Sequence, residues 1–142
     1  MIEYKDNIEG VTSDRLNGFF VGWPKPPTPD TLLGILHNSS HIVLAIDSDT
    51  DTVIGFITAI SDNIISAYIP LLEVLPQYQG KGIGGELMRR MMKKLEGLYM
   101  IDLICNKDKV AFYEKFGLKS ATKTGVEAMI GRDFAAQSGR KE

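Results

Sequence analysis

The feature that most constrains the fold is a cluster of glycines in residues 71–92, between an apolar stretch and a helical pattern. From residue 83 onward, apolar side chains recur every fourth residue, as on one face of a helix: Ile83, Leu87, Met91 and Leu95. The first N–H groups of a helix have no partner inside it and carry the positive end of its dipole. Glycines there let a ligand approach the bare backbone. Residues 79–85 therefore predict a phosphate or diphosphate site.

Composition narrows the class of protein. The chain has 142 residues, 44% of them hydrophobic, which predicts one domain over residues 1–134 and a frayed tail over 135–142. A net charge of −2 argues against a nucleic-acid partner. The single cysteine, Cys105, excludes an internal disulfide and provides no metal-ligand cluster. No stretch has the apolar core of a signal peptide or the length of a bilayer-spanning helix, so we expect a cytoplasmic protein without a metal or membrane partner.

The periodicity predicts an α/β domain with a mixed sheet, in the order β-α-α-β-β-β-α-β-α-β-β. Strands are expected at residues 2–5, 41–46, 53–60, 64–75, 99–105, 118–121 and 126–130, the long fourth one being broken near Pro70. Helices are expected at residues 12–20, 28–40, 83–95 and 108–116. Residues 21–30 contain four prolines and form neither a regular helix nor a central strand.

Three interpretations of residues 79–85 remain open on the loop alone. The first is an ordinary glycine turn that leads into a packed helix. The second is a dinucleotide fingerprint, since Gly80, Gly82 and Gly85 satisfy G-x-G-x-x-G. That fingerprint belongs in the first strand–helix–strand unit, and too little chain follows here. The third is an acyl-coenzyme A site. The motif of a phosphate-loop NTPase is absent from the sequence.

Two blocks of sequence resemble the GNAT superfamily, the Gcn5-related N-acetyltransferases. The first block, Q/R-x-x-G-x-G/A at the head of a helix, is matched by Gln79, Gly82 and Gly84. The second, an asparagine after the next strand and then F-Y-x-x-x-G, is matched by Asn106, Phe112, Tyr113 and Gly117. The resemblance covers roughly residues 41–130. It implies the GNAT fold and an N-acetyltransferase that moves an acetyl group from acetyl-CoA to a primary amine in a ternary complex.

The resemblance also implies where coenzyme A binds. In the family, the pantetheine arm lies along the splayed fourth strand and bonds to its backbone, while the diphosphate sits on the N–H groups of the glycine loop. Carried over to this sequence, the coenzyme A contacts are Leu72, Glu73, Val74, Gln79, Gly80, Lys81, Gly82, Ile83, Gly84, Asn106 and Phe112.

The reaction needs two proton transfers: the amine must lose a proton, and the departing thiolate benefits from a donor. The resemblance assigns the donor role to Tyr113. In several relatives a glutamate of the fourth strand accepts the proton, but the aligned residue here is Tyr68. Glu73 is the only carboxylate between residues 64 and 75 and is the best substitute. A water relay to backbone carbonyls is the alternative.

The acceptor end is less defined. The resemblance places the segment around Phe20 and Trp23 over the acceptor site, with Tyr68 beside it. For Phe20 and Trp23, packing in the core beneath a rigid loop is an equally good interpretation. The expected partner is an amine on a small molecule or peptide, and a homodimer through the C-terminal hairpin is a further expectation. A different class of function, a non-catalytic acyl-CoA-binding or sensing module, would keep the glycine loop and lose the proton chemistry.

Overall fold

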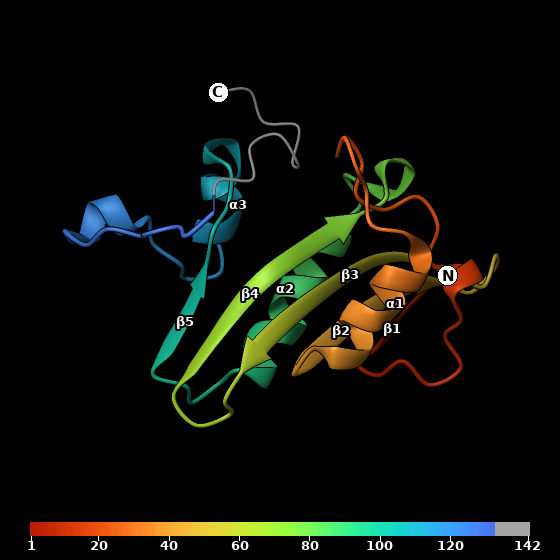
Figure 1. Cartoon of the computed structure of the whole chain (residues 1–142), viewed down its shortest axis with the longest axis horizontal. Helices are drawn as coiled ribbons and strands as arrows, with labels where there is room; N and C mark the ends of the chain where they lie inside the picture. Colours follow the sequence, from red (N-terminus) through yellow and green to blue (C-terminus); the bar gives the residue numbers. More distant parts are fainter. Residues whose placement is uncertain (133–142) are drawn as a thin grey trace.

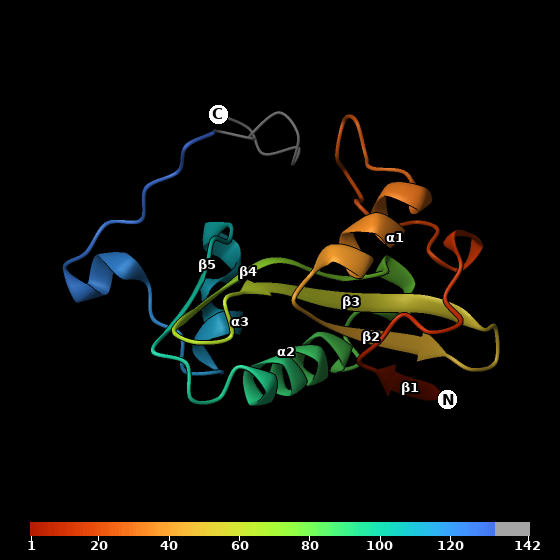
Figure 2. The ribbon, with the colours of Figure 1, turned by 60° about the horizontal axis from the view of Figure 1, so that its bottom comes forward.

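A computed structural model describes residues 1–132 as a five-stranded sheet with helices on both faces (Figures 1 and 2). The strands are β1 (Ile2–Lys5), β2 (His41–Asp47), β3 (Thr52–Ser61), β4 (Ser66–Val74) and β5 (Met100–Leu103). The helices are α1 (Pro29–Asn38), α2 (Ile83–Lys94) and α3 (Val110–Glu114). The strands lie in chain order, and all neighbours are antiparallel except β4 and β5, which are parallel. The predicted mixed sheet is confirmed.

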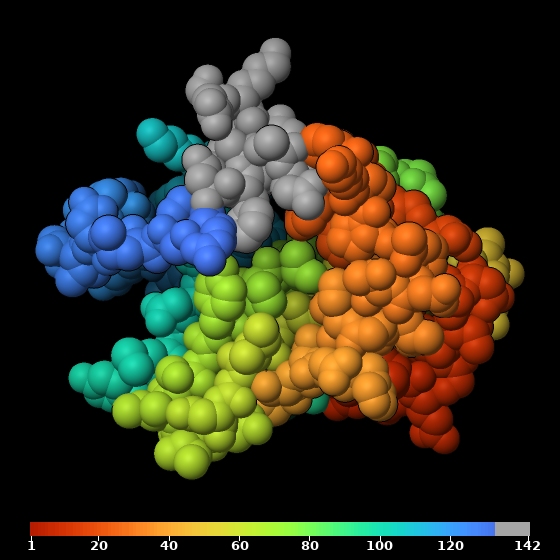
Figure 3. Space-filling view, in the orientation of Figure 1, coloured from red at the N-terminus to blue at the C-terminus, as the bar shows by residue number. Residues whose placement is uncertain are grey.

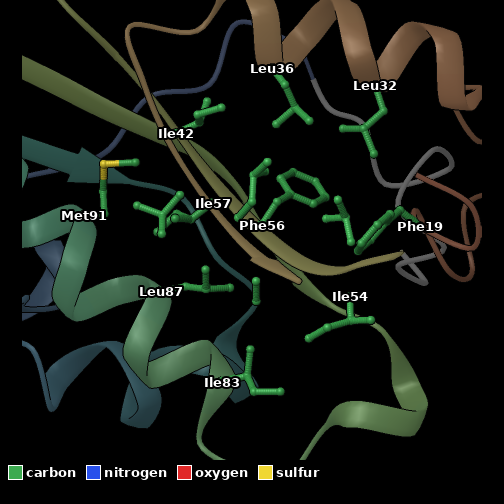
Figure 4. Close-up of a cluster of buried hydrophobic side chains, with 14 of the residues drawn as sticks. Phe19, Leu32, Leu36, Ile42, Ile54, Phe56, Ile57, Ile83, Leu87 and Met91 are labelled. Carbon is green, nitrogen blue, oxygen red and sulfur yellow. The ribbon is translucent and has the colours of Figure 1, made fainter. Parts of the chain in front are cut away.

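The core forms where α2 packs on the sheet. Its predicted apolar face is confirmed, because Ile83 is 4% exposed and Leu87 and Met91 are fully buried. Figure 4 shows these side chains on one side of Ile57, with Leu32 and Leu36 of α1 on the other side of the sheet. Figure 2 shows the same arrangement, with α1 and α2 on opposite faces. Within residues 1–132, no helix is long and apolar enough to cross a bilayer.

The segment before α1 differs from its prediction. The helix expected at residues 28–40 forms as α1. Thr28 caps it, because its hydroxyl accepts the Thr31 N–H at 3.2 Å, and Pro29 occupies the first turn. The helix predicted at residues 12–20 is wrong: only a 3-10 turn, Ser13–Arg15, forms. Gly18 and Phe20 have φ values of 92° and 63°, in the left-handed region, where a right-handed helix cannot continue.

The last two predicted strands, at residues 118–121 and 126–130, are also wrong. A 3-10 turn, Ala121–Thr124, takes their place, and the residues after it are extended without pairing. Strands need a paired neighbour and one buried face. Val126 and Met129 instead remain 61% and 86% exposed. The predicted tail, residues 135–142, lies outside the described residues.

The feature of the sheet that matters most for function is where β4 leaves β5. The two strands pair from Ser66 with Met100 to Ile69 with Leu103, and then pairing stops. On its other side, β4 has a bulge, since Tyr68 pairs with Ile60 while Leu71 pairs with Thr58. Pro70, which has no N–H, sits in this bulge. The predicted break near Pro70 is confirmed, and within residues 1–132 the second half of β4 has a free edge toward β5.

Candidate active site

A cleft of about 1170 Å³ opens beside the free half of β4. Its lining comes from seven parts of the described chain: the proline-rich loop (residues 18–28), β3, β4, the turn after β4, the segment after β5, α3, and the C-terminal segment (residues 126–132). In Figure 3, the yellow-green surface of β4 lies between the orange loop and α1 on one side and the blue C-terminal segment on the other. The predicted site residues that line it are Phe20, Trp23, Tyr68, Leu72, Glu73, Gln79, Asn106 and Tyr113.

Of the remaining predicted residues, Val74 ends β4, Phe112 lies on α3, and the others lie at the N-terminus of α2. Gly82 precedes the helix with a φ of 81°, and no side chain caps it. The first backbone bond of the helix runs from the Glu86 N–H to the Gly82 carbonyl at 3.1 Å. Within residues 1–132, the N–H groups of residues 83–85 therefore have no acceptor. A Cβ atom on Gly80 or Gly82 would meet nothing within 4 Å, so the approach to these donors is open.

The two polar side chains of this turn have protein contacts. The Gln79 Nε2 donates to the Val74 carbonyl at 2.9 Å and so ties the turn to the end of β4. The Lys81 ammonium lies 5.3 Å from the centre of the Tyr78 ring. The Tyr78 hydroxyl in turn donates to the Asp47 carboxylate at 2.6 Å. Lys81 thus keeps a positive charge beside the helix N-terminus, while Gln79 fixes the backbone of the turn.

Helix α3 packs against this same helix end. The Phe112 ring lies 5.0 Å from the Tyr113 ring and 5.3 Å from the Phe116 ring, in edge-to-face arrangements. A Cβ atom on Gly84 would lie 3.7 Å from the Phe112 ring. Asn106 lies just before this helix, and its carbonyl accepts the Lys109 N–H at 2.9 Å. Phe112 therefore supports both the glycine turn and the position of Tyr113.

Tyr113 lines the cleft as a half-buried phenol. Burial is the main cause that raises its pKa to about 12, and the neighbouring Cys105 thiol adds to the shift. The hydroxyl therefore keeps its proton at neutral pH and can donate it. Burial likewise raises the pKa of Cys105, with a smaller contribution from Asp108, which disfavours a reactive thiolate.

Glu73 joins β4 to the proline-rich loop. Its two carboxylate oxygens accept the Phe20 N–H at 2.8 and 2.9 Å, and one also accepts the Val21 N–H at 3.4 Å. Burial raises the pKa of Glu73, and these N–H bonds partly oppose the shift. Tyr68, on the same strand, is 38% exposed and has its side chain at the cleft wall.

The two interpretations of the aromatic residues both hold in part. Phe20 is only 3% exposed, and its ring packs 5.0 Å from Trp23 and 6.3 Å from Phe56. Phe20 is thus a core residue that also reaches the cleft. Trp23 is half-buried and forms more of the exposed wall.

Several lining residues had no signal in the sequence. They are Phe56, Ile104 and, from the C-terminal segment, Met129, Ile130, Gly131 and Arg132. The periodicity of residues 126–130 indicated a sheet strand and gave no sign that the chain returns to the cleft. Within residues 1–132, no three His, Cys, Asp or Glu side chains are arranged to hold a metal ion.

A second hollow, of about 620 Å³, lies between β1 and α2 and is lined by several cations. Two of them are already paired, because Lys94 contacts Asp6 at 2.7 Å and Arg90 contacts Glu86 at 2.8 Å. The Arg90 guanidinium also stacks 4.6 Å above the Tyr4 ring. The hollow is therefore partly neutralised and holds none of the predicted site residues, so the cleft beside β4 is the better candidate.

Comparison with known proteins agrees with this choice. Residues 8–118 match the Acetyltransferase (GNAT) family. The chain is 34% identical over 100 residues to the uncharacterized N-acetyltransferase ycf52 of Porphyra purpurea, covering 68% of this chain and 58% of that protein. It is 30% identical over 130 residues to GCN5-related N-acetyltransferase 2, chloroplastic, of Arabidopsis thaliana, covering 78% and 50%. The chain therefore spans little more than half the length of these relatives.

The fold also matches solved structures. A putative acetyltransferase from Deinococcus radiodurans R1 superposes with a TM-score of 0.86 at 48% identity, over 99% of this chain and 94% of that one. A GNAT family acetyltransferase of Streptococcus pneumoniae TIGR4 superposes with a TM-score of 0.74 at 28% identity, over 94% and 98%. With the family match over residues 8–118, these similarities show that the chain belongs to the GNAT family of acetyltransferases.

Proposed function

We propose that this protein is an N-acetyltransferase that moves an acetyl group from acetyl-CoA to a primary amine of a small molecule or peptide, by direct attack in a ternary complex. One observation carries the proposal: the free edge of β4 leads directly to the uncapped N-terminus of α2, and Tyr113 lies in the cleft between them. An extended amide-bearing chain that ends in a diphosphate is complementary to this arrangement.

The residues present fit coenzyme A. The backbone groups of residues 72–74 on the side away from β3 would bond the pantetheine amides, except the Val74 carbonyl, which already accepts from Gln79. The N–H groups of residues 83–85 would hold the diphosphate. The left-handed glycines leave room for it, since no Cβ blocks Gly80 or Gly82. When bound, acetyl-CoA supplies the activated acetyl thioester. A backbone N–H near Leu72 would polarise the thioester carbonyl.

Two side chains of the cleft are suited to the proton transfers. Tyr113 stays protonated at neutral pH and would donate to the developing thiolate. Glu73 is the one carboxylate that lines the described cleft, and burial raises its pKa, which makes it a better proton acceptor. It would take the amine proton directly or through water. The alternative is a water relay to backbone carbonyls with no single base.

The decisive experiment has two parts. Calorimetric titration of coenzyme A into the protein should give a saturable heat. An amine panel with acetyl-CoA and thiol detection should then identify acceptors by their rate of thiol release. Saturable binding with no turnover on any amine would favour the acyl-CoA-binding or sensing module. No binding of coenzyme A would overturn the proposal altogether.

Two further predictions concern the whole protein. The homodimer cannot use the predicted hairpin, which does not form, but apolar side chains remain exposed on the C-terminal segment and at the start of β5: Val126, Met129, Ile130 and Met100. Light scattering after size-exclusion chromatography tests the homodimer. The cytoplasmic location stays a prediction, to be tested by cell fractionation.

A further inference from the structure

We propose that Glu73 is also a positioning residue: its carboxylate holds the proline-rich loop in the conformation that forms the acceptor wall of the cleft. This inference rests on the proposed function, because a fixed wall matters to a substrate that binds against it. It gives Glu73 a second task, which both carboxylate oxygens carry out together.

The first argument is that Glu73 is the loop's main polar anchor. Within residues 1–132, the hydrogen bonds that tie residues 18–27 to another element are those from the Phe20 and Val21 N–H groups to Glu73. The other bond in this stretch, from the Trp23 N–H to the Phe20 carbonyl at 3.2 Å, stays within the loop. Removal of the carboxylate would therefore leave the loop attached by side-chain packing alone.

The second argument is the strained backbone at Phe20. Within residues 1–132, the other non-glycine residues with positive φ are Asp51 and Asn63, whose residue types tolerate the left-handed region. Phe20, with a φ of 63°, is a bulky aromatic residue in the same region. Such a conformation is unfavourable for a bulky side chain and persists only where surrounding contacts impose it. The bonds to Glu73 are contacts of that kind.

The third argument is the chemistry of the contact. Successive backbone N–H groups next to left-handed residues form a concavity that binds anions. Here the Phe20 and Val21 N–H groups are successive, and Gly18 and Gly22 flank them with φ values of 92° and 85°. A carboxylate oxygen can accept two hydrogen bonds, and within residues 1–132 Oε1 of Glu73 accepts only the Phe20 N–H, so it keeps an acceptor site that an amine or water can use.

The titration of Glu73 can be observed separately from its neighbours. Within residues 1–132, Glu73 is the one carboxylate that lines the cleft, and no histidine lines it. The other titratable or charged residues there are Tyr68, Cys105, Lys109, Tyr113 and Arg132. A step in amide chemical shifts between pH 7 and pH 4 within the cleft therefore reports the titration of Glu73.

The test begins with the wild-type protein and needs no substrate. In ¹H–¹⁵N spectra, the amide protons of Phe20 and Val21 should move in one common step as the pH falls from 7 to 4, because both lose the same anionic acceptor. The absence of a shared step at these two amides would overturn the proposal.

A matched pair of variants tests the anchor itself. Glu73→Gln should speed hydrogen exchange at the Phe20 and Val21 amides about tenfold, since it removes a charge-assisted acceptor. Glu86→Gln makes the same substitution on α2, where Glu86 pairs with Arg89 and Arg90, and should leave both amides unchanged. Exchange at the Leu87 amide, in the core helix, reports whether each variant is folded. Equal exchange of the loop amides in the wild type and Glu73→Gln would overturn the anchor.

The functional arm uses the best acceptor from the amine panel. Loss of the anchor should raise KM for that amine about tenfold in Glu73→Gln, with KM for acetyl-CoA unchanged. An unchanged amine KM would mean that the wall does not depend on Glu73. Because the spectra need neither substrate, a failure of the proposed function leaves the test of the anchor intact.

Discussion

The two ends of the cleft are built in different ways. At the α2 end, the proposed ligand contacts are backbone N–H groups, and their geometry comes from two left-handed glycines and an uncapped 12-residue helix. At the loop end, the surface consists of side chains, Phe20, Trp23 and Tyr68, and one carboxylate holds it in place. The first end is fixed by secondary structure, and the second depends on tertiary contacts.

This difference indicates which end is adaptable. A site formed by the N-terminus of a helix and its backbone N–H groups binds anionic groups such as phosphate, whatever side chains surround it. A site made of side chains on a loop changes with each substitution. The α2 end therefore suits a constant co-substrate, and the loop end suits an acceptor that differs among proteins of this fold. If the two ends are separate, a variant at one end should change the binding constants of that end only.

The largest effect is expected between the two ends, at Tyr113. Tyr113→Phe should lower kcat about 100-fold, since it removes a proton donor from the reaction and keeps the ring that packs on Phe112. Thiol-release kinetics measure kcat, and calorimetry should show unchanged affinity for coenzyme A. Tyr4→Phe, which loses a hydroxyl beside Arg90, is the matched control and should keep full activity. Equal kcat in the two variants would remove Tyr113 from the mechanism.

At the α2 end, Gly82→Ala should weaken coenzyme A binding about tenfold, because a Cβ narrows the approach to the helix N–H groups and the left-handed backbone resists alanine. Gly97→Ala is the matched control. Gly97 has a φ of 91° in equally open space, beyond the other end of α2. Both variants should lose similar stability in thermal unfolding, and only the first should lose affinity in calorimetry. A similar loss of affinity in both would mean that strain alone is responsible.

At the loop end, Trp23→Ala should raise KM for the amine about threefold to fivefold, the size expected when one partly exposed aromatic contact is lost. Affinity for coenzyme A should not change, which calorimetry can check. Trp23→Phe retains an aromatic face and should stay within about twofold of the wild type. A change in coenzyme A affinity in Trp23→Ala would show that the two ends are coupled.

The smallest expected effect concerns stability at the loop anchor. Burial raises the pKa of Glu73 above its value in the unfolded chain, so the folded protein binds the proton more tightly. The stabilisation from this proton is complete below the unfolded value of about 4.5 and is lost as the pH rises through the folded value. As the pH rises from 4 to 7, the Tm of the wild type should therefore fall relative to the Tm of Glu73→Gln, which thermal unfolding measures. A constant difference over that range would contradict the raised pKa.

The parts of the fold that were predicted correctly have strong local signals. The apolar side chains at every fourth residue from Ile83 to Leu95 predicted α2, and the helix expected at residues 28–40 forms as α1. The prediction of a helix at residues 12–20 was wrong. The apolar residues there are buried, but the backbone that carries them is irregular and contains left-handed residues. The last two strands failed because no neighbour in the described chain pairs with them.

The sequence by itself determined the α2 end of the site. The helix start, the glycines and the preceding strand are consecutive in the chain, so their relation depends on local backbone preferences. Only the tertiary structure decided the loop end. Glu73 meets Phe20 across 53 residues of chain, and the C-terminal segment reaches the cleft from another 50 or more residues away. Such contacts depend on how the sheet, the loop and the chain end pack together, and no local periodicity encodes that packing.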